Sequence, residues 1–283
     1  MRIPQYFRSH RSRRLPQPST GQNGLGFTLF LLLLILPSLL HAQEKWITIE
    51  KICPVDGATC ALLEPASPPA PVLSQPARFD ALEEPFSHPN SWFQCRSCGF
   101  ACYMTDFKKM EPAQAKKALA IASAMGKPDE ERSYNMIKFS ERLEVAQLYF
   151  PVLGRTGQPA FLADFYRLKG YVYDQDNQHD KAREARTQAR MITADLIKDG
   201  KNAGLLREYL WELAALDYRL GDHKTALENL ERAAKLRYYS QMLNQQGNEQ
   251  RNRELTNLIA DLQQRIESDD KKAAEQKHPA KNP

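Results

Sequence analysis

The chain has 283 residues, with 39 lysines and arginines against 34 acidic residues and a formal net charge of +5. That excess comes from five arginines in the first 14 residues, and the rest of the chain carries 34 basic and 34 acidic residues. Nucleic acids demand a clustered basic surface. Because the rest of the chain is neutral, we do not expect a nucleic-acid partner. The rest is long enough for one or two domains with a sizeable core.

Residues 1–42 have the layout of a secretory signal peptide. The basic stretch "MRIPQYFRSHRSRR" precedes the apolar run "FTLFLLLLILPSLL", which Pro37 interrupts, and Ala42 follows where a signal peptidase would cut. The apolar run is short for a bilayer span. We therefore expect Sec-type export, cleavage after Ala42, a periplasmic or secreted protein, and no stable membrane span after cleavage. Retention of the leader as an anchor stays open.

Residues 43–107 are predicted to form a small cysteine-rich β element. The alternation of "EKWITIEKIC" predicts a strand that leads into Cys53. All five cysteines lie in this segment: Cys53, Cys60, Cys95, Cys98 and Cys102. Between the two groups of cysteines, residues 64–90 are rich in proline, which cannot donate to a β ladder, so a loop is predicted there.

Residues 108–266 are predicted to be helical, with breaks at "GKPDE", "VLGRTGQPA", "DQDNQ", "KDGKNAG" and "LGD". Apolar residues recur there at spacings of three and four, which predicts core-facing stripes. The stripes are Met136, Phe139, Leu143, Ala146 and Phe150; Leu206, Tyr209, Leu210, Leu213 and Ala214; and Leu255, Leu258, Ile259, Leu262 and Ile266. Residues 267–283 lack this periodicity and are predicted to be a disordered tail.

Two stretches of the helical part are similar to each other at an offset of 44 residues. The offset pairs small residues and two histidines: Gly170 with Ala214, His179 with His223, Ala182 with Ala226, and Ala189 with Ala233. This pattern resembles the tetratricopeptide repeat, whose usual length is about 34 residues. Extra helix near "MITADLIKDGKNAG" explains the longer offset. The predicted fold is mainly α, with tetratricopeptide-like antiparallel helical hairpins, in a solenoid or a bundle, after the β element.

Three chemistries compete for the cysteines. "CRSCG" has the spacing and the glycine of a zinc knuckle, whereas "CPVDG" has Asp56 where a second cysteine would complete one. An exported chain meets an oxidising environment, which favours disulfides among the same residues and Cys102. Redox catalysis is the third alternative, although no βαβ frame surrounds the motif. His88, in the preceding loop, is a candidate spare ligand. His179 and His223, near the starts of their helices, are interpreted as architectural.

The segment "WFQCRSCGFACYMTDF" resembles a family of uncharacterised bacterial proteins that join a CPxCG zinc-ribbon-like segment to tetratricopeptide-like helices. The resemblance rests on Trp92, Cys95, Cys98, Gly99, Phe100, Ala101, Asp106 and Phe107, and it covers residues 45–235. It implies metal ligands at Cys53, Cys95 and Cys98. Cys60 would replace the ligand missing at position 56, or Asp56 would bind through oxygen. The predicted ligand set is Cys53, Cys60, Cys95 and Cys98, with zinc as the candidate ion.

These observations predict a scaffold or binding module rather than an enzyme. The absence of a Gly-rich phosphate loop, a serine elbow or an HExxH motif removes the common reaction centres. Stacked helical hairpins offer a surface for a protein or peptide partner. The alternative is an envelope enzyme, thiol-disulfide or metal-dependent, that is centred on the cysteine cluster.

Overall fold

The computed structural model describes residues 46–66, 86–126 and 137–277. The expected signal peptide, most of the predicted loop 64–90 and Met136 lie outside these residues. Within the described ranges, no helix combines the length and the apolar character that a membrane crossing needs.

Two short antiparallel hairpins form the β element. Strand β1 (Trp46–Ile52) pairs with β2 (Thr59–Pro65), and β3 (Trp92–Gln94) pairs with β4 (Ala101–Tyr103). The predicted strand before Cys53 is confirmed. β2 continues to Pro65, so residues 64 and 65 of the predicted loop belong to a strand, and residues 67–85 lie outside the described part. We call these two hairpins together the cysteine ribbon.

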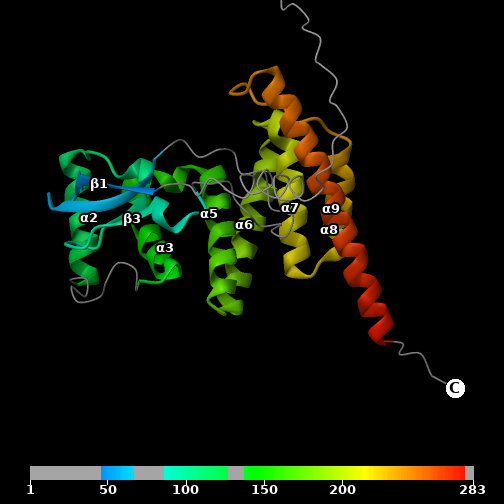
Figure 1. Ribbon diagram of the computed structural model, residues 1–283, viewed down its shortest axis with the longest axis horizontal. Helices are drawn as coiled ribbons and strands as arrows, with labels where there is room; N and C mark the ends of the chain where they lie inside the picture. Colours follow the sequence, from blue (N-terminus) through cyan, green and yellow to red (C-terminus); the bar gives the residue numbers. More distant parts are fainter. Residues whose placement is uncertain (1–45, 67–85, 127–136, 278–283) are drawn as a thin grey trace, which may run out of the picture. The chain divides into compact units, whose positions relative to one another are not determined.

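The rest of the described chain is helical (Figure 1), which confirms a mainly α fold with antiparallel helical hairpins after a small β element. The four later predicted breaks separate successive helices, and most of "GKPDE" lies outside the described residues. The α-helices are α2 (Pro112–Met125), α3 (Phe139–Leu148), α4 (Phe150–Leu153), α5 (Pro159–Gln175), α6 (His179–Asp199), α7 (Leu206–Leu220), α8 (His223–Ala234) and α9 (Gln245–Lys277). Short 3-10 turns are η2 (Pro89–Ser91), η3 (Met104–Asp106), η5 (Arg155–Gly157) and η6 (Ala203–Leu205).

Helices α5 and α6 form one hairpin, and α7 and α8 form a second. At the second turn, the Asp222 carboxylate accepts from the Thr225 backbone N–H at 3.1 Å and caps α8. In the first hairpin, a Cβ on Gly170 would lie 2.8 Å from Arg186 Cγ, so α5 and α6 approach closely because this residue is glycine. Helix α6 continues through residues 191–199, which is the extra helix that the longer offset predicted.

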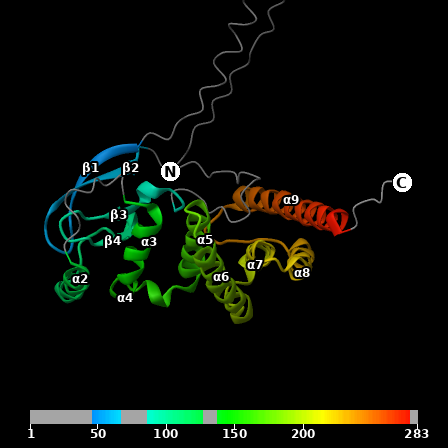
Figure 2. The same cartoon turned by 90° about the horizontal axis from the view of Figure 1, so that it is seen from below.

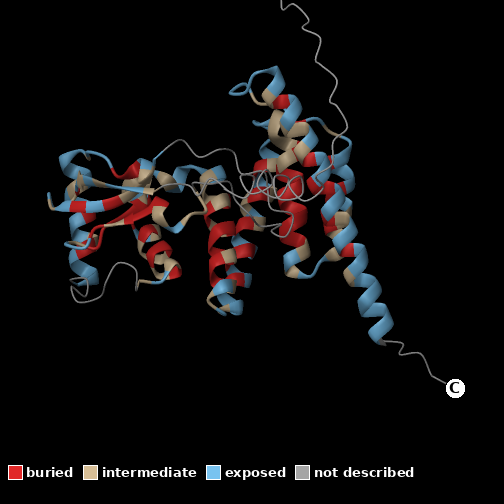
Figure 3. Ribbon diagram, in the orientation of Figure 1, coloured by how far each residue is buried: buried red, intermediate tan, exposed pale blue. Residues whose placement is uncertain are grey.

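The end of the last helix corrects the sequence prediction. The tail expected from residue 267 is helical as far as Lys277, and only residues 278–283 lie outside the described part. Alanine, lysine, glutamate and glutamine sustain a helix without an apolar stripe, because their intrinsic helix propensity is high. Two contacts hold this stretch beside the second hairpin: Tyr218 donates to Asp269 at 2.7 Å, and His223 Nδ1 lies 2.5 Å from Asp270. The outer end of α9 is exposed (Figure 3).

Two parts of the apolar core matter for the site. One joins α7, α8 and α9 through the buried side chains Leu210, Ala214, Leu230, Leu255, Leu258, Ile259, Leu262 and Ile266, which confirms the last predicted stripe. The other joins β3 to α3, α4 and α5 through Trp92, Leu143, Phe150 and Phe165. Figure 2 shows α3 beside β3 and β4. The cysteine ribbon therefore shares a core with the first helices.

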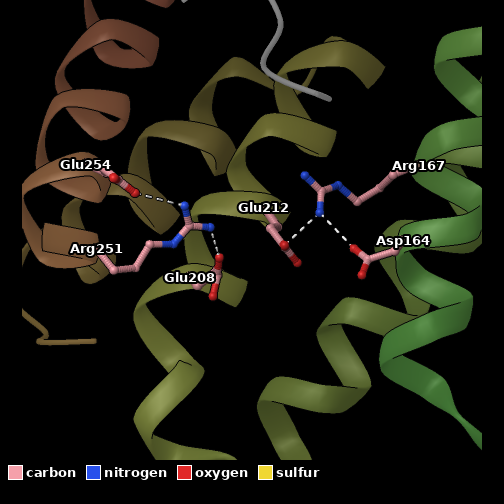
Figure 4. A network of polar contacts seen from close by, with 6 residues as sticks. All are labelled: Asp164, Arg167, Glu208, Glu212, Arg251 and Glu254. Atoms are coloured by element: carbon pink, nitrogen blue, oxygen red, sulfur yellow. Dashed lines mark hydrogen bonds and ion pairs between the residues drawn. The ribbon is translucent and has the colours of Figure 1, made fainter. Parts of the chain in front are cut away.

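Ion pairs connect α5, α7 and α9 (Figure 4). Arg167 of α5 donates to Glu212 of α7 at 2.6 Å and to Asp164 at 3.1 Å. Arg251 of α9 pairs with Glu208 of α7 and with Glu254 at 3.3 Å. The Arg167 side chain is only 3 % exposed. Because a lone buried charge is costly, loss of Glu212 would destabilise the junction more than loss of an exposed pair.

Candidate metal centre

The turns of the two hairpins are two knuckles with the same backbone. The first knuckle comprises residues 53–57 and the second residues 95–99. Their hydrogen bonds match one for one: Cys53 N–H to Ala58 O (2.8 Å), Gly57 N–H to Cys53 O (3.0 Å), Cys95 N–H to Phe100 O (2.8 Å) and Gly99 N–H to Cys95 O (2.9 Å). Gly57 and Gly99 have φ of 75° and 76°, a left-handed conformation that favours glycine.

This match makes the knuckles equivalent residue by residue, at an offset of 42 residues. Lys51 lies opposite Cys60 in the first hairpin, as Phe93 lies opposite Cys102 in the second. Cys53 thus corresponds to Cys95, Asp56 to Cys98 and Cys60 to Cys102. At the equivalent position, the first knuckle therefore has the carboxylate oxygen of Asp56 where the second knuckle has the sulfur of Cys98.

Four side chains from the two knuckles converge. Ligand atoms of Cys53, Asp56, Cys95 and Cys98 all lie within 4.8 Å of one another. Cys53 Sγ and Cys98 Sγ are 3.7 Å apart, and Cys95 Sγ lies 3.9 Å from Asp56 Oδ1. Each knuckle supplies two donors, so an ion at the centre would tie one hairpin to the other.

The separations fit a shared metal ion better than a disulfide. A zinc–sulfur distance of about 2.3 Å in a tetrahedral site puts neighbouring sulfurs about 3.8 Å apart. A disulfide requires about 2.0 Å. The observed 3.7 Å between Cys53 and Cys98 is close to the first value, and all five cysteines are free thiols in the structure. Three sulfurs and one carboxylate oxygen are a donor set that suits zinc.

Hydrogen bonds among the thiols shift their pKa values. Hydrogen bonds from Cys53 and then Cys98 lower the pKa of Cys95, so Cys95 is the thiol of the three that loses its proton most readily. The same bonds to Cys95 and Cys98, with burial, raise the pKa of Cys53. At Cys98 the contact with Cys53 lowers the pKa, but the contact with Cys95 and burial raise it to about 12. A divalent cation would displace these shared protons.

The centre is walled by aromatic side chains and open at Asp56. Phe93, Phe100 and Tyr149 are fully buried against the cysteines, and the rings of Phe100 and Tyr149 meet edge to face with centroids 4.8 Å apart. Burial, followed by the electrostatic interaction with the Cys98 side chain, raises the pKa of Tyr149. Among the four donors, Asp56 is the exposed one. Solvent therefore reaches the centre from the side of the first knuckle.

The structure differs from the predicted ligand set at one position. The mutually close donors include Asp56 and not Cys60, which agrees with the alternative of an oxygen ligand. Cys60 lies next to this group, where its thiol is hydrogen-bonded with that of Cys95 and donates to Ala58 O at 3.8 Å. The reason is its strand position, which follows the knuckle instead of lying in its turn. Cys102, the equivalent residue, is fully buried.

The histidines of the sequence analysis do not join the centre. His88 Nδ1 accepts from the Asn90 backbone N–H at 3.1 Å, and its ring stacks on Trp46 with centroids 4.2 Å apart, so His88 is not among the converging donors. His179 and His223 are the first residues of α6 and α8, the equivalent positions that were predicted.

The residues of the bacterial-family resemblance attach the cysteine ribbon to the helices. Trp92 is buried in the core with α3 and α5, and its indole N–H donates to Phe86 O at 2.9 Å. Asp106 binds Arg155 through two guanidinium bonds of 2.6 and 2.9 Å. A surface cavity of about 220 Å³ lies beside this pair, and its lining contains none of the four donors. These residues anchor the centre and do not open a cleft to it.

Comparison of the chain with known protein families, with curated proteins and with solved structures gave no match.

Proposed function

We propose that the protein is an exported, tetratricopeptide-like scaffold or protein-binding module whose cysteine ribbon holds a structural zinc ion. The observation that carries this proposal is the position of the centre, where two donors from each knuckle meet over a core shared with the first helices. Four short strands bury too little surface to fold alone. Metal binding would supply the missing stabilisation, as it does in other small ribbons.

The test is the metal content and intact mass of the purified protein. We expect one zinc ion per chain, five reduced cysteines and, for protein taken from the cell envelope, a chain that begins at Gln43. A strong chelator should lower the melting temperature of the wild-type chain, because the ion binds only the folded state. It should leave that of the Cys95→Ser variant unchanged. A metal-free protein whose mass shows disulfides would contradict the structural-zinc proposal.

The helical part would hold a protein or peptide partner. The support is the arrangement of α5, α7 and α9, which ion pairs connect along one face. A photo-crosslinking residue in place of Asp164, on that face of α5, tests this. The matched control is Arg183, an exposed residue of α6. A partner captured reproducibly from position 164 and not from position 183 supports the proposal, and equal capture contradicts it.

The second candidate is an envelope enzyme of the thiol-disulfide or metal-dependent kind. The lowered pKa of Cys95 favours it, since a thiolate is the reactive form of cysteine. Its complete burial opposes it. Exchange of the native protein with a small disulfide separates the two: rapid modification of Cys95 supports the enzyme, whereas protection of Cys95 until the protein unfolds supports the structural centre.

A further inference from the structure

The loop between α8 and α9, residues 235–244, exposes three large apolar side chains close together. The exposed fractions are 59 % for Tyr239, 96 % for Met242 and 41 % for Leu243. Single exposed apolar residues are common on protein surfaces. Three of them within five residues, at the beginning of α9 (orange in Figure 1), form a local apolar tip.

The loop is held in place by two asparagines at the start of α9. Asn248 is 7 % exposed; its amide accepts from Ser240 N–H at 2.7 Å and donates to the carbonyls of Ser240 and Leu243, both at 3.0 Å. Asn252 makes the same kind of two-way pair with the Tyr238 backbone, at 2.9 and 2.8 Å. The side-chain amides of Asn248 and Asn252 thus fix the path of the loop, and the fold holds the three apolar side chains at the surface.

A second loop supports the tip from below. The Tyr239 backbone N–H donates to Gly204 O at 2.8 Å, and a Cβ on Gly204 would lie 2.2 Å from Tyr239 O. Only glycine permits this approach of the two loops. The backbone of the loop that carries the exposed apolar side chains is therefore held both by the asparagines of α9 and by the contact with Gly204.

The charges nearest the tip in the sequence are basic, and they lie between Glu231 on one side and Glu249 on the other. Residues 232–248 contain Arg232, Lys235 and Arg237 and no acidic residue. Arg237 is exposed and lies two residues before Tyr239. Lys235 pairs with Glu231 at 2.6 Å, but both side chains are about 70 % exposed, and such a pair is weak in water. A surface that binds this tip would have an apolar interior for the three side chains and negative charges at its rim for the basic residues.

We propose that the tip binds the surface of an anionic lipid membrane. Met242 and Leu243 enter the boundary between head groups and acyl chains, Tyr239 lies at the level of the head groups, and Arg237 contacts lipid phosphates. A stable protein interface buries about 800 Å² on each partner, far more than three side chains on one loop provide. A membrane surface needs only a few inserted apolar side chains and adjacent cations. This inference does not depend on the proposed function.

The test places a fluorescent reporter at the tip of the full chain. The Met242→Trp variant is titrated with vesicles of phosphatidylcholine and brominated phosphatidylglycerol in equal parts, and the signal of the wild-type chain is subtracted. The control is Met191→Trp, since Met191 is 54 % exposed on α6. If the apolar leader alone held the chain on the vesicle, both reporters would be quenched alike.

We expect strong quenching of the Met242→Trp reporter and little of the Met191→Trp reporter. In the Met242→Trp background, Arg237→Gln should weaken the tip's response about fivefold at low salt, because one cation near an anionic surface contributes about that factor. Arg183→Gln should leave the response within about twofold. Equal quenching of the two reporters, no quenching of either, or the same response on vesicles of brominated phosphatidylcholine alone would each overturn the proposal, and a protein crosslinked at position 242 without lipid contact would replace it.

Discussion

The identity of the fourth ligand can be decided by substituting, one at a time, the two residues that could supply it. Asp56 belongs to the group of mutually close donors, whereas Cys60 does not and is only hydrogen-bonded with Cys95. We predict that Asp56→Ala weakens zinc binding and that Cys60→Ser leaves it nearly unchanged. Asp56→Cys gives the first knuckle the same donor as Cys98 and should strengthen binding.

The expected size of the effect follows from the number of ligands. Structural zinc binds small ribbons with about 10–16 kcal/mol, which is roughly 3 kcal/mol for each of four ligands. A loss of that size weakens binding about a hundredfold. Because Asp56 is exposed and water can take its place, we expect between about tenfold and a hundredfold for Asp56→Ala. For Cys60→Ser we expect less than about threefold, because its sulfur is not among the four converging donor atoms.

The assay is competition for zinc between the protein and a chromophoric chelator at constant pH. The far-ultraviolet circular dichroism spectrum of each variant checks that the helices are intact. The cobalt-substituted protein gives a second readout, since its charge-transfer absorption grows with the number of thiolate ligands and should increase only in Asp56→Cys. Weakening by Cys60→Ser equal to that by Asp56→Ala would refute the assignment of the ligands.

Three further predictions concern stability. Leu262→Ala should lower the free energy of unfolding by about 2–5 kcal/mol in urea titrations, because Leu262 is fully buried among three helices. Gly204→Ala should lower the melting temperature by several degrees because its Cβ meets the neighbouring loop, whereas Gly157→Ala, with open space around it, should not; equal effects would contradict the close approach. Burial raises the pKa of Asp174, but the hydrogen bonds and charges of Arg186 and His179 together outweigh it and hold that pKa below its usual value. The folded pKa lies below the unfolded one, so Asp174 stabilises the fold above about pH 4 and that contribution is lost as the pH falls further; in Asp174→Asn this part of the acid dependence should disappear.

Much of the helical part could be predicted because apolar periodicity reports burial directly. Leu255, Leu258, Ile259, Leu262 and Ile266 are all buried as their spacing predicted. Periodicity does not report where a helix ends when its last turns are exposed. For residues 267–277, the prediction took the absence of a stripe as the absence of a helix, whereas intrinsic propensity and two contacts with the second hairpin maintain it.

The ligand set was only partly predictable, because ligand choice depends on the position of a residue within a turn. Spacing identified Cys53, Cys95 and Cys98, which lie in the knuckles. Cys60 is the predicted replacement for the ligand missing at position 56, and residue type alone does not show that it follows the turn. Alignment of "CPVDGATC" with "CRSCGFAC" contains the missing information, since it pairs Asp56 with Cys98. The strands β3 and β4 have three residues each, too few for a period-two pattern to be recognised.

The stability of the cysteine ribbon and that of the helical part both depend on the packing of Trp92. The residue belongs to strand β3, yet its indole is fully enclosed by aromatic side chains of α5 and by Phe86 and Tyr103, with Phe165 at 5.4 Å between ring centroids. Neither half has a finished interior without the other. If the β half were expressed alone, the Trp92 indole would be exposed to water and the fragment would tend to precipitate. The helical half alone would have a cavity where the indole packs. Recombination between genes should therefore pass the two halves on together as a single heritable module.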